Sequence, residues 1–177
     1  KFLSTNVQAI DRDKKSLLIA EEFKKKFPLR FKFYRLKFSQ LDTVSKDNVD
    51  VIIFDLGLST IQLDDLERGF SFKSHKKLNM TMGLNEISAL EAINNLSEVD
   101  LKLVIKNLGD EKEASKIAKN IVKHRNIKKI TSTDTLVKII EKSKKKNFLN
   151  KINPCTKTFQ ALRIFVNKEI TELINGI

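Results

Sequence analysis

The chain has 177 residues, 41% of them hydrophobic and 32% charged, so it can form one domain, or one domain and part of another, and general disorder is excluded. Its 34 Lys and Arg against 22 Asp and Glu give a formal net charge of +12. That balance favours a polyanionic partner such as RNA, DNA or an acidic membrane surface. An AT-rich genome also produces lysine-rich proteins, so charge alone leaves the partner open.

Cysteine and histidine are too scarce for a disulfide scaffold or a metal centre. Cys155 is the sole cysteine, which excludes an intrachain disulfide and a zinc site built from cysteines. His75 and His124 share no ligand motif. No run approaches the roughly 18 apolar residues of a membrane span, and the first residues do not form a signal peptide. We expect a cytoplasmic protein without a metal or a membrane partner.

The start of the chain predicts a strand followed by a helix. Residues 5–10 are a short, mostly apolar segment that ends at Asp11, which indicates a buried strand with a carboxylate at its C-terminal end. Residues 14–27 then place apolar side chains near helical spacing, with Lys and Glu on the other face. Pro28 ends this predicted helix.

Two further strands are predicted before residue 57. Residues 31–38 alternate apolar and basic side chains, and residues 49–54 are almost wholly apolar, as in a central strand buried on both faces. The pattern predicts part of an open α/β sheet, in which ligands bind beyond the carboxyl ends of the strands. Asp11, Phe38 and Asp55 all fall at predicted strand ends and are therefore candidate ligand contacts.

After residue 72 the pattern becomes a loop and then helical. Helices are predicted to begin at Ser88, at Ser97, at Asp110 and at either Thr131 or Thr133. Gly109 is predicted to end the second of them as a left-handed residue. The fourth ends in the lysine run 142–146, which is either a solvated helix end or a contact for phosphates.

The predicted helical module covers residues 76–150, and a polar hinge follows it. One long helix is then predicted to run from residue 156 until Gly176 stops it. Its apolar side chains form one stripe at helical spacing: Phe159, Leu162, Val166, Ile170 and Leu173.

The most unusual stretch is FDLGLSTIQLDDLERGFSF at residues 54–72, too polar for a core and too specific for a generic loop. It closely resembles the pattern DLGxSSxQLDxxxRGFSF of the bacterial 16S ribosomal RNA methyltransferases called MraW or RsmH. Residues 156–170, TKTFQALRIFVNKEI, are similar to that family's TRTFQALRIxVNxEL, and AIDRD at 9–13 is similar to its GIDRD. Weaker similarity at 78–82 and 108–122 extends the resemblance over nearly the whole chain.

The resemblance implies a Rossmann-like, α/β methyltransferase domain that uses S-adenosylmethionine and is interrupted by an all-helical insertion. The implied boundaries are a partial methyltransferase domain at 1–75, a substrate-recognition insertion at 76–153 and a returning helix at 154–177. The implied reaction is methylation of the N4 amine of a cytidine in 16S rRNA of the small ribosomal subunit. The exact nucleotide and the oligomeric state stay open.

Four matched residues are implied to form the cofactor pocket. Asp11 would hold the ribose hydroxyls, Phe38 would lie against the adenine, and Asp55 and Gln62 would lie near the reacting methyl. Asp55 is also the candidate acceptor for the N4 hydrogens. Each has a simpler alternative: Asp11 as a helix cap, Phe38 as core, Asp55 as a turn residue and Gln62 as surface.

A basic cluster surrounds the same stretch and is the candidate RNA contact. It consists of Arg68, Lys73, His75, Lys76 and Lys77. Phe70 or Phe72 could stack on an extruded base, whereas the alternative places both rings in the core.

The sequence also departs from the family. It has no match to the glycine-rich turn DATxGxGGHS or to the segment GGRLxxISFHSLEDR, so it is predicted to be an internal piece that is poorly soluble and inactive by itself. Residues at five motif positions differ from the family's: Ile61, Asn79, Thr81, Asn153 and Lys157. Two rival functions follow, a related methyltransferase acting on another amine and a non-catalytic RNA-binding module.

Overall fold

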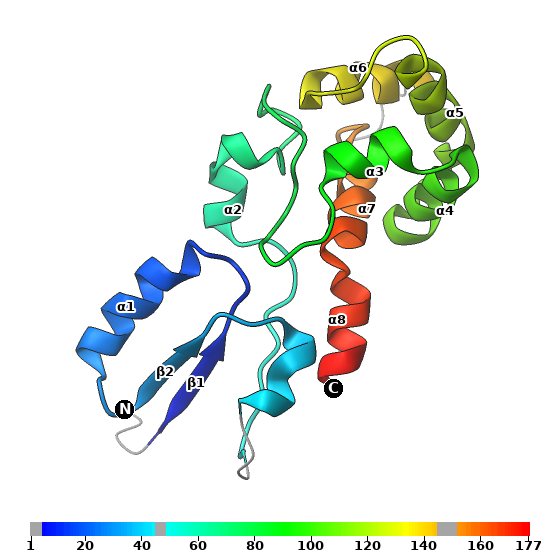
Figure 1. Cartoon of the computed structure of the whole chain (residues 1–177). Coiled ribbons are helices and arrows are strands. Elements are labelled where there is room, and N and C mark those ends of the chain that lie inside the picture. The colour runs from blue at the N-terminus through cyan, green and yellow to red at the C-terminus, as the bar shows by residue number, and fades with distance from the viewer. Residues whose placement is uncertain (1–4, 45–48, 145–151) are drawn as a thin grey trace. The chain divides into compact units, whose positions relative to one another are not determined.

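The computed structural model describes residues 5–44, 49–144 and 152–177 and shows a mixed structure of helices with one small parallel sheet (Figure 1). The chain divides into two compact units, which are described here one at a time. Unit 1 comprises Lys1–Leu56, Met82–Leu84 and Glu169–Ile177, and unit 2 comprises Gly57–Thr81 and Asn85–Lys168. The end of the lysine run at 145–146 and the start of the hinge lie outside the described residues.

Unit 1 contains the sheet. Strands β1 (Val7–Ile10) and β2 (Phe31–Tyr34) pair in parallel, with the first residue of one opposite the first residue of the other. Helix α1 (Ser16–Lys26) makes the crossover between them that parallel strands require and runs alongside the strands in Figure 1. The first predicted strand and the first predicted helix are therefore confirmed, but the strand is not buried, because its first two residues are exposed and its last two are half-buried.

The prediction of longer strands in unit 1 is wrong. β2 ends at Tyr34, and Phe38 opens the 3-10 helix η1 (Phe38–Thr43) instead of ending a strand. Residues 51–56 form no strand, and Val51 and Ile53 are 71% and 85% exposed. A strand exists only through hydrogen bonds to a neighbour, and within the described ranges the sheet has two strands. The apolar, β-branched composition of residues 49–54 does not show whether a neighbouring strand is there to pair with them.

The predicted last helix is two helices in different units. Helix α7 (Thr156–Asn167) lies in unit 2 and helix α8 (Glu169–Gly176) lies in unit 1. Lys168 between them has φ 51°, ψ 34°, and its N–H is bonded to the carbonyls of the preceding turn. The left-handed residue ends α7, while the apolar spacing continues across it, so periodicity alone missed the break.

Unit 2 is helical and holds nearly all of the buried core. Its helices are α2 (Thr60–Asp64), η2 (Leu66–Arg68), α3 (Ala89–Asn95), α4 (Glu98–Gly109), α5 (Ala114–Arg125), α6 (Thr133–Ser143) and α7. The fully buried large side chains include Leu78, Ile93, Leu101, Ile105, Ile117, Leu136 and Leu162. In the described part of the chain no helix is long and apolar enough to cross a membrane.

Two of the predicted helix starts in unit 2 are confirmed by side-chain hydrogen bonds. The hydroxyl of Ser88 accepts from the backbone N–H of Glu91 at 3.3 Å, and the Glu91 carboxylate accepts from the Ser88 N–H at 2.7 Å. Ser97 accepts from the N–H of Asp100 at 3.1 Å. Both helices begin where a capping side chain satisfies an otherwise unpaired backbone donor.

The other predicted boundaries shift. Gly109 is the last helical residue of α4, and Asp110 is the left-handed residue (φ 48°), so it does not cap α5. A Cβ at Gly109 would overlap the carbonyl of Lys157, which shows that glycine lets α7 approach α4 closely. The cap of α6 is Ser132, which lies between the two threonines predicted for it.

Candidate functional site

Asp11 follows β1 and holds the turn into α1. One carboxylate oxygen accepts the backbone N–H of Asp13 at 2.7 Å, and the other accepts the hydroxyl of Ser16 at 2.6 Å. Neither bond is a helix cap, because α1 begins after Lys15 without a side-chain capping hydrogen bond. A carboxylate oxygen has two lone pairs, so each can accept one more hydrogen bond, as a ribose diol would require.

A ring contact joins the two segments of unit 1 that contain Phe38 and Asp55. The rings of Phe38 and Phe54 lie edge to face, with centroids 5.7 Å apart and an interplanar angle of 88°. Asp55, the next residue, is exposed, and in the part of the chain that the structure describes no hydrogen bond or ion pair reaches its carboxylate. Its side chain is therefore available for a ligand.

Gln62 lies in unit 2, whereas the three other predicted cofactor contacts lie in unit 1. The side chain is buried, and its carbonyl oxygen accepts the N–H of Ser59 at 3.1 Å while the Ser59 hydroxyl accepts the Gln62 N–H at 3.3 Å. This reciprocal capping box starts α2. The alternative that Gln62 is a surface residue is wrong.

The aromatic and arginine side chains after α2 are structural in unit 2. Arg68 donates from Nη2 to the carbonyl of Thr81 at 2.6 Å, and its guanidinium lies 5.2 Å from the centroid of the buried Phe70 ring. The half-buried Phe72 meets Phe159 edge to face with centroids 6.1 Å apart. Both rings pack inside unit 2, in agreement with the core alternative.

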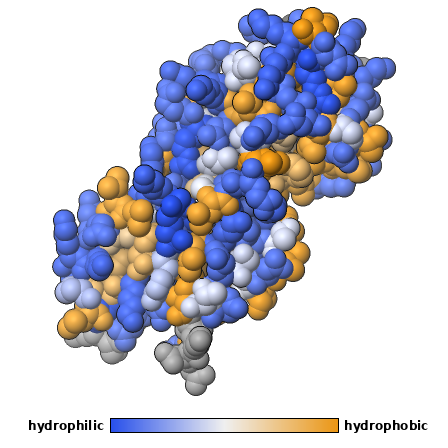
Figure 2. All heavy atoms as spheres, viewed as in Figure 1, coloured by the Kyte–Doolittle hydropathy of each residue, from blue (hydrophilic) through white to orange (hydrophobic). Residues whose placement is uncertain are grey.

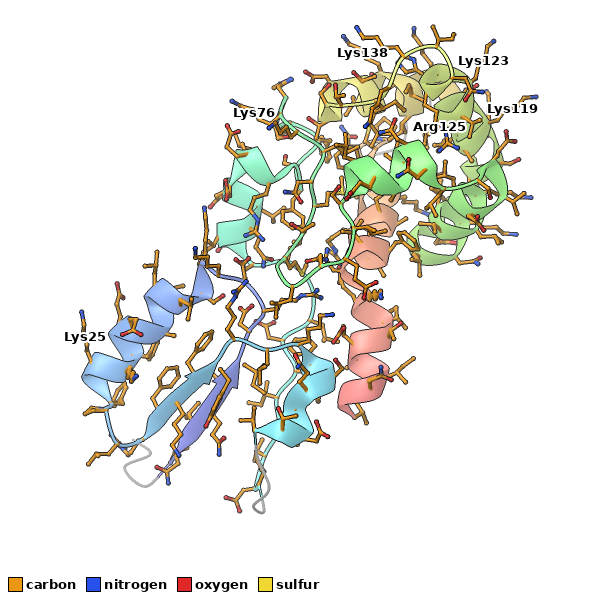
Figure 3. The ribbon with its side chains drawn as sticks, viewed as in Figure 1. Lys25, Lys76, Lys119, Lys123, Arg125 and Lys138 are labelled. Carbon is orange, nitrogen blue, oxygen red and sulfur yellow. The ribbon has the colours of Figure 1, made fainter. Side chains whose placement is uncertain are left out.

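The predicted RNA lysines are exposed. Lys73 and Lys77 extend from the loop before α3, and Lys76, labelled in Figure 3, pairs with Glu67 at 2.8 Å. The hydrogen bond and charge of Glu67 raise the pKa of Lys76. His75 lies 2.5 Å from Asp134 at the start of α6. The lysines of this cluster are thus accessible, and one already has an acidic partner.

Two structural residues of unit 1 escaped the sequence interpretation. Arg12, inside the AIDRD motif, donates from Nε to the carbonyl of Gly83 at 2.6 Å, and a Cβ at Gly83 (φ 117°) would overlap the Arg12 carbonyl. Burial lowers the pKa of Arg12 although Glu172 opposes that effect. The motif itself was the available signal, because Arg12 lies between the two acids that were noticed.

Glu172 is the other missed residue and joins α8 to η1. Its Oε2 accepts the hydroxyl of Ser39 at 2.6 Å and the N–H of Ser39 at 3.3 Å, and Lys37 lies 3.6 Å from its Oε1. Burial raises the pKa of Glu172, but the Ser39 hydrogen bonds and the nearby cations outweigh it, so the pKa lies below its usual value. No local motif indicated this contact.

The fold and the candidate site define the class of protein. It combines helices with a small parallel sheet and has an acid directly after its first strand. The model of the MraW methylase family matches residues 1–177, and the chain belongs to the MraW methylase family.

Curated relatives carry one name, "Ribosomal RNA small subunit methyltransferase H". Those of Ehrlichia canis, Ehrlichia ruminantium (strain Welgevonden) and Bartonella bacilliformis are 42%, 41% and 40% identical over 176, 177 and 172 residues. Each alignment covers 97% of this chain but only 59%, 59% and 52% of the relative. The chain thus spans between half and three fifths of the length of these relatives.

Proposed function

We propose that the protein is an S-adenosylmethionine-dependent methyltransferase that modifies the N4 amine of a cytidine in 16S rRNA of the small subunit. The observation that carries this proposal is the family match along residues 1–177, joined by relatives named for ribosomal RNA methylation. A protein with this substrate works in the cytoplasm.

The proposed domain layout keeps a Rossmann-like methyltransferase domain at 1–75, a helical recognition insertion at 76–153 and a returning segment at 154–177, which contains α7 and α8. Support for it comes from the parallel pair β1–β2 with a carboxylate beyond its C-terminal end, and from the succession of helices between residues 89 and 143. In open α/β sheets that end of the strands is the usual ligand position.

The cofactor contacts proposed here are Asp11, Phe38, Asp55 and Gln62. S-adenosylmethionine would supply a methyl group made electrophilic by its sulfonium. Asp11 fits the ribose hydroxyls because each of its oxygens has a further acceptor position, and the half-buried ring of Phe38 offers an apolar surface for adenine. Gln62 is fixed by its capping box, so its position would be set before the ligand arrives.

Asp55 is proposed as the residue that acts on the cytidine. The N4 lone pair is delocalised into the ring, which makes this amine a weak nucleophile. A carboxylate that accepts a hydrogen bond from N4–H would localise the lone pair and then take up the proton that the amine loses. The exposed carboxylate of Asp55, which no described side chain or backbone donor engages, suits both tasks.

The proposed RNA contacts near the target are Lys73, Lys76 and Lys77, with Arg68 as a fourth. The exposed lysines would hold phosphates as point charges. Arg68 already bonds the Thr81 carbonyl and covers Phe70. Its substitution would therefore also disturb the loop.

The test uses protein expressed from the complete gene, labelled S-adenosylmethionine and unmethylated small ribosomal subunits. Digestion of the RNA should yield labelled N4-methylcytidine, and Asp11→Ala should abolish it through lost cofactor binding. Asp55→Asn should retain cofactor binding and lose turnover; full turnover would remove the role given to Asp55. RNA binding without any transfer would favour the non-catalytic alternative.

A further inference from the structure

A hollow in the surface of unit 2 gathers cations and contains no acid. It is lined from the end of α5, from the loop that follows and from one face of α6 by side chains that include His124, Lys128, Lys129, Thr135, Lys138 and Lys142. No Asp, Glu, Phe or Tyr lines it. Ammonium groups and hydroxyls without a neighbouring carboxylate are the donors that phosphate oxygens accept.

Some exposed lysines of unit 2 already have an acidic partner. Lys76, Lys157 and Lys168 each pair with a carboxylate. Across residues 5–44, 49–144 and 152–177, by contrast, no ion pair or side-chain hydrogen bond engages Lys128, Lys138 or Lys142. No described carboxylate therefore pairs directly with these three ammonium groups, whereas the charge of Lys129 acts on Glu91.

Two lysines of the hollow lie on one face of α6. Lys138 and Lys142 are four residues apart, so both extend from the same side of α6, and like charges at that spacing destabilise a helix. Figure 3 shows Lys138 extending outward from α6, and Lys119 and Lys123 outward from α5. Lys142 could serve the negative end of the helix dipole, but Lys138 lies in the middle of α6 and does not.

The loop between α5 and α6 is held in place before any ligand binds. The side chain of Asn94 donates to the carbonyl of Ile130 at 2.8 Å and accepts its N–H at 3.1 Å, and Ile130 is buried. Arg125 donates to the carbonyls of Ile93 and Leu96, both at 2.6 Å. These bonds fix the end of α5 and the loop to α3, which lowers the entropy lost when the lysines bind a ligand.

We propose that this α5–α6 hollow docks the phosphate backbone of RNA and is a site distinct from the loop lysines Lys73, Lys76 and Lys77. The choice of RNA among polyanions rests on the proposed function. Without an aromatic side chain for stacking, the hollow contacts phosphates and carries no base specificity. It would fix the RNA while the target nucleotide is bound elsewhere.

The test compares two double variants of the same chain by fluorescence anisotropy with a labelled single-stranded RNA of mixed sequence. Lys138→Gln/Lys142→Gln removes two charges from the hollow, and Lys102→Gln/Lys106→Gln removes two exposed charges at the same spacing on α4. The hollow variant should bind about tenfold more weakly. Its plot of log Kd against log salt should be less steep by about 1.4, about 0.7 for each lost phosphate contact. The α4 variant should match the unchanged chain.

An equal loss in both variants would show that only net charge matters and would overturn the proposal, as would unchanged RNA binding in the hollow variant. Loss of binding to phosphatidylserine vesicles with RNA binding intact would overturn it in favour of a lipid surface. Methyl transfer by the complete protein is measured separately. If transfer fails while the hollow variant still loses RNA, the docking site stands and the proposed methylation falls.

Discussion

The two units bury their apolar residues very differently. Among the described residues of unit 1 the buried apolar side chains are Ala20 and Met82, while Val51 and Ile53 are largely exposed. Figure 2 shows apolar side chains among the hydrophilic ones on the visible surface of this unit. In unit 2 the helices cover a continuous series of side chains with no exposure, such as Leu101 and Ile105.

The difference follows from the elements themselves. A two-stranded sheet with the short helices α1, η1 and α8 leaves apolar faces exposed to water, whereas the packed helices of unit 2 cover theirs. The stability of this chain therefore resides mainly in unit 2, while three of the four proposed cofactor contacts lie in unit 1.

The largest expected effect is on the free energy of unfolding. The same substitution, Ile to Ala, is made once in each unit to test how differently the two units bury apolar residues. Ile105→Ala in α4 should lower the free energy of unfolding by about 2–5 kcal/mol, because it leaves a cavity among fully buried side chains. Ile53→Ala, at a position 85% exposed, should change it by less than about 0.5 kcal/mol. Urea titration followed by circular dichroism measures both. Similar losses for the two variants would show that residues 51–53 are covered in solution.

The next largest effect on stability is expected at two glycines with positive φ. A Cβ at Gly69 (φ 70°) would overlap the carbonyl of Lys77, whereas a Cβ at Gly57 (φ 110°) would meet nothing. Gly69→Ala should cost about 2–4 kcal/mol, because strain and backbone overlap add, and Gly57→Ala about 1 kcal/mol from strain alone. The same urea titration ranks the two variants. An equal loss in the free energy of unfolding would show that the loop at Lys77 moves aside.

A smaller effect is expected in unit 1. Glu172→Gln should destabilise that unit by about 1–3 kcal/mol near neutral pH, because charge-assisted bonds to Ser39 are lost. Since the pKa of Glu172 is below its usual value, its contribution is present above the unfolded pKa of about 4.3 and disappears as the pH falls through the folded pKa.

Tyr34 reports on this effect because it is the sole tyrosine, it ends β2, and the chain has no tryptophan. Its fluorescence should follow the unfolding of unit 1, and the difference between Glu172→Gln and the unchanged chain should shrink steadily as the pH falls below about 4.3. A difference that persists in acid would mean that the carboxylate charge is not what holds α8 on η1.

The smallest expected effect is on the chemical reactivity of a buried thiol. Burial, with the charge of Glu141, raises the pKa of Cys155 to about 11, so the neutral thiol is favoured and should alkylate slowly with iodoacetamide at mildly basic pH. Ile105→Ala should speed alkylation by opening unit 2, and Glu172→Gln should not. Equal acceleration by both would show that the two units unfold together.

Local signals predicted part of the fold well. Ser88 and Ser97 start helices because a hydroxyl satisfies the backbone N–H three residues on, a rule that needs no tertiary information. The strand predicted at 49–54 failed because pairing depends on what lies beside it. The break at Lys168 failed because a left-handed lysine leaves the apolar spacing intact.

The candidate acids Asp11 and Asp55 were predicted from the apolar segments that precede them. The structure leaves acceptor capacity on both, and their roles stay predictions. The burial of Gln62 was missed because its partner is its own capping residue, Ser59, a contact that hydropathy cannot reveal. Glu172 was missed because its partner Ser39 lies 133 residues away.

That separation bears on the order in which the chain assembles. Unit 1 is made of three segments of the chain, and the segments joined through Ser39 and Glu172 are separated in sequence by nearly all of unit 2. Closing so long a loop in an unfolded chain costs entropy, and prior folding of unit 2 removes most of that cost. We therefore expect α8 to dock on η1 late, so that the proposed cofactor edge is completed only after the proposed RNA-binding helices have formed.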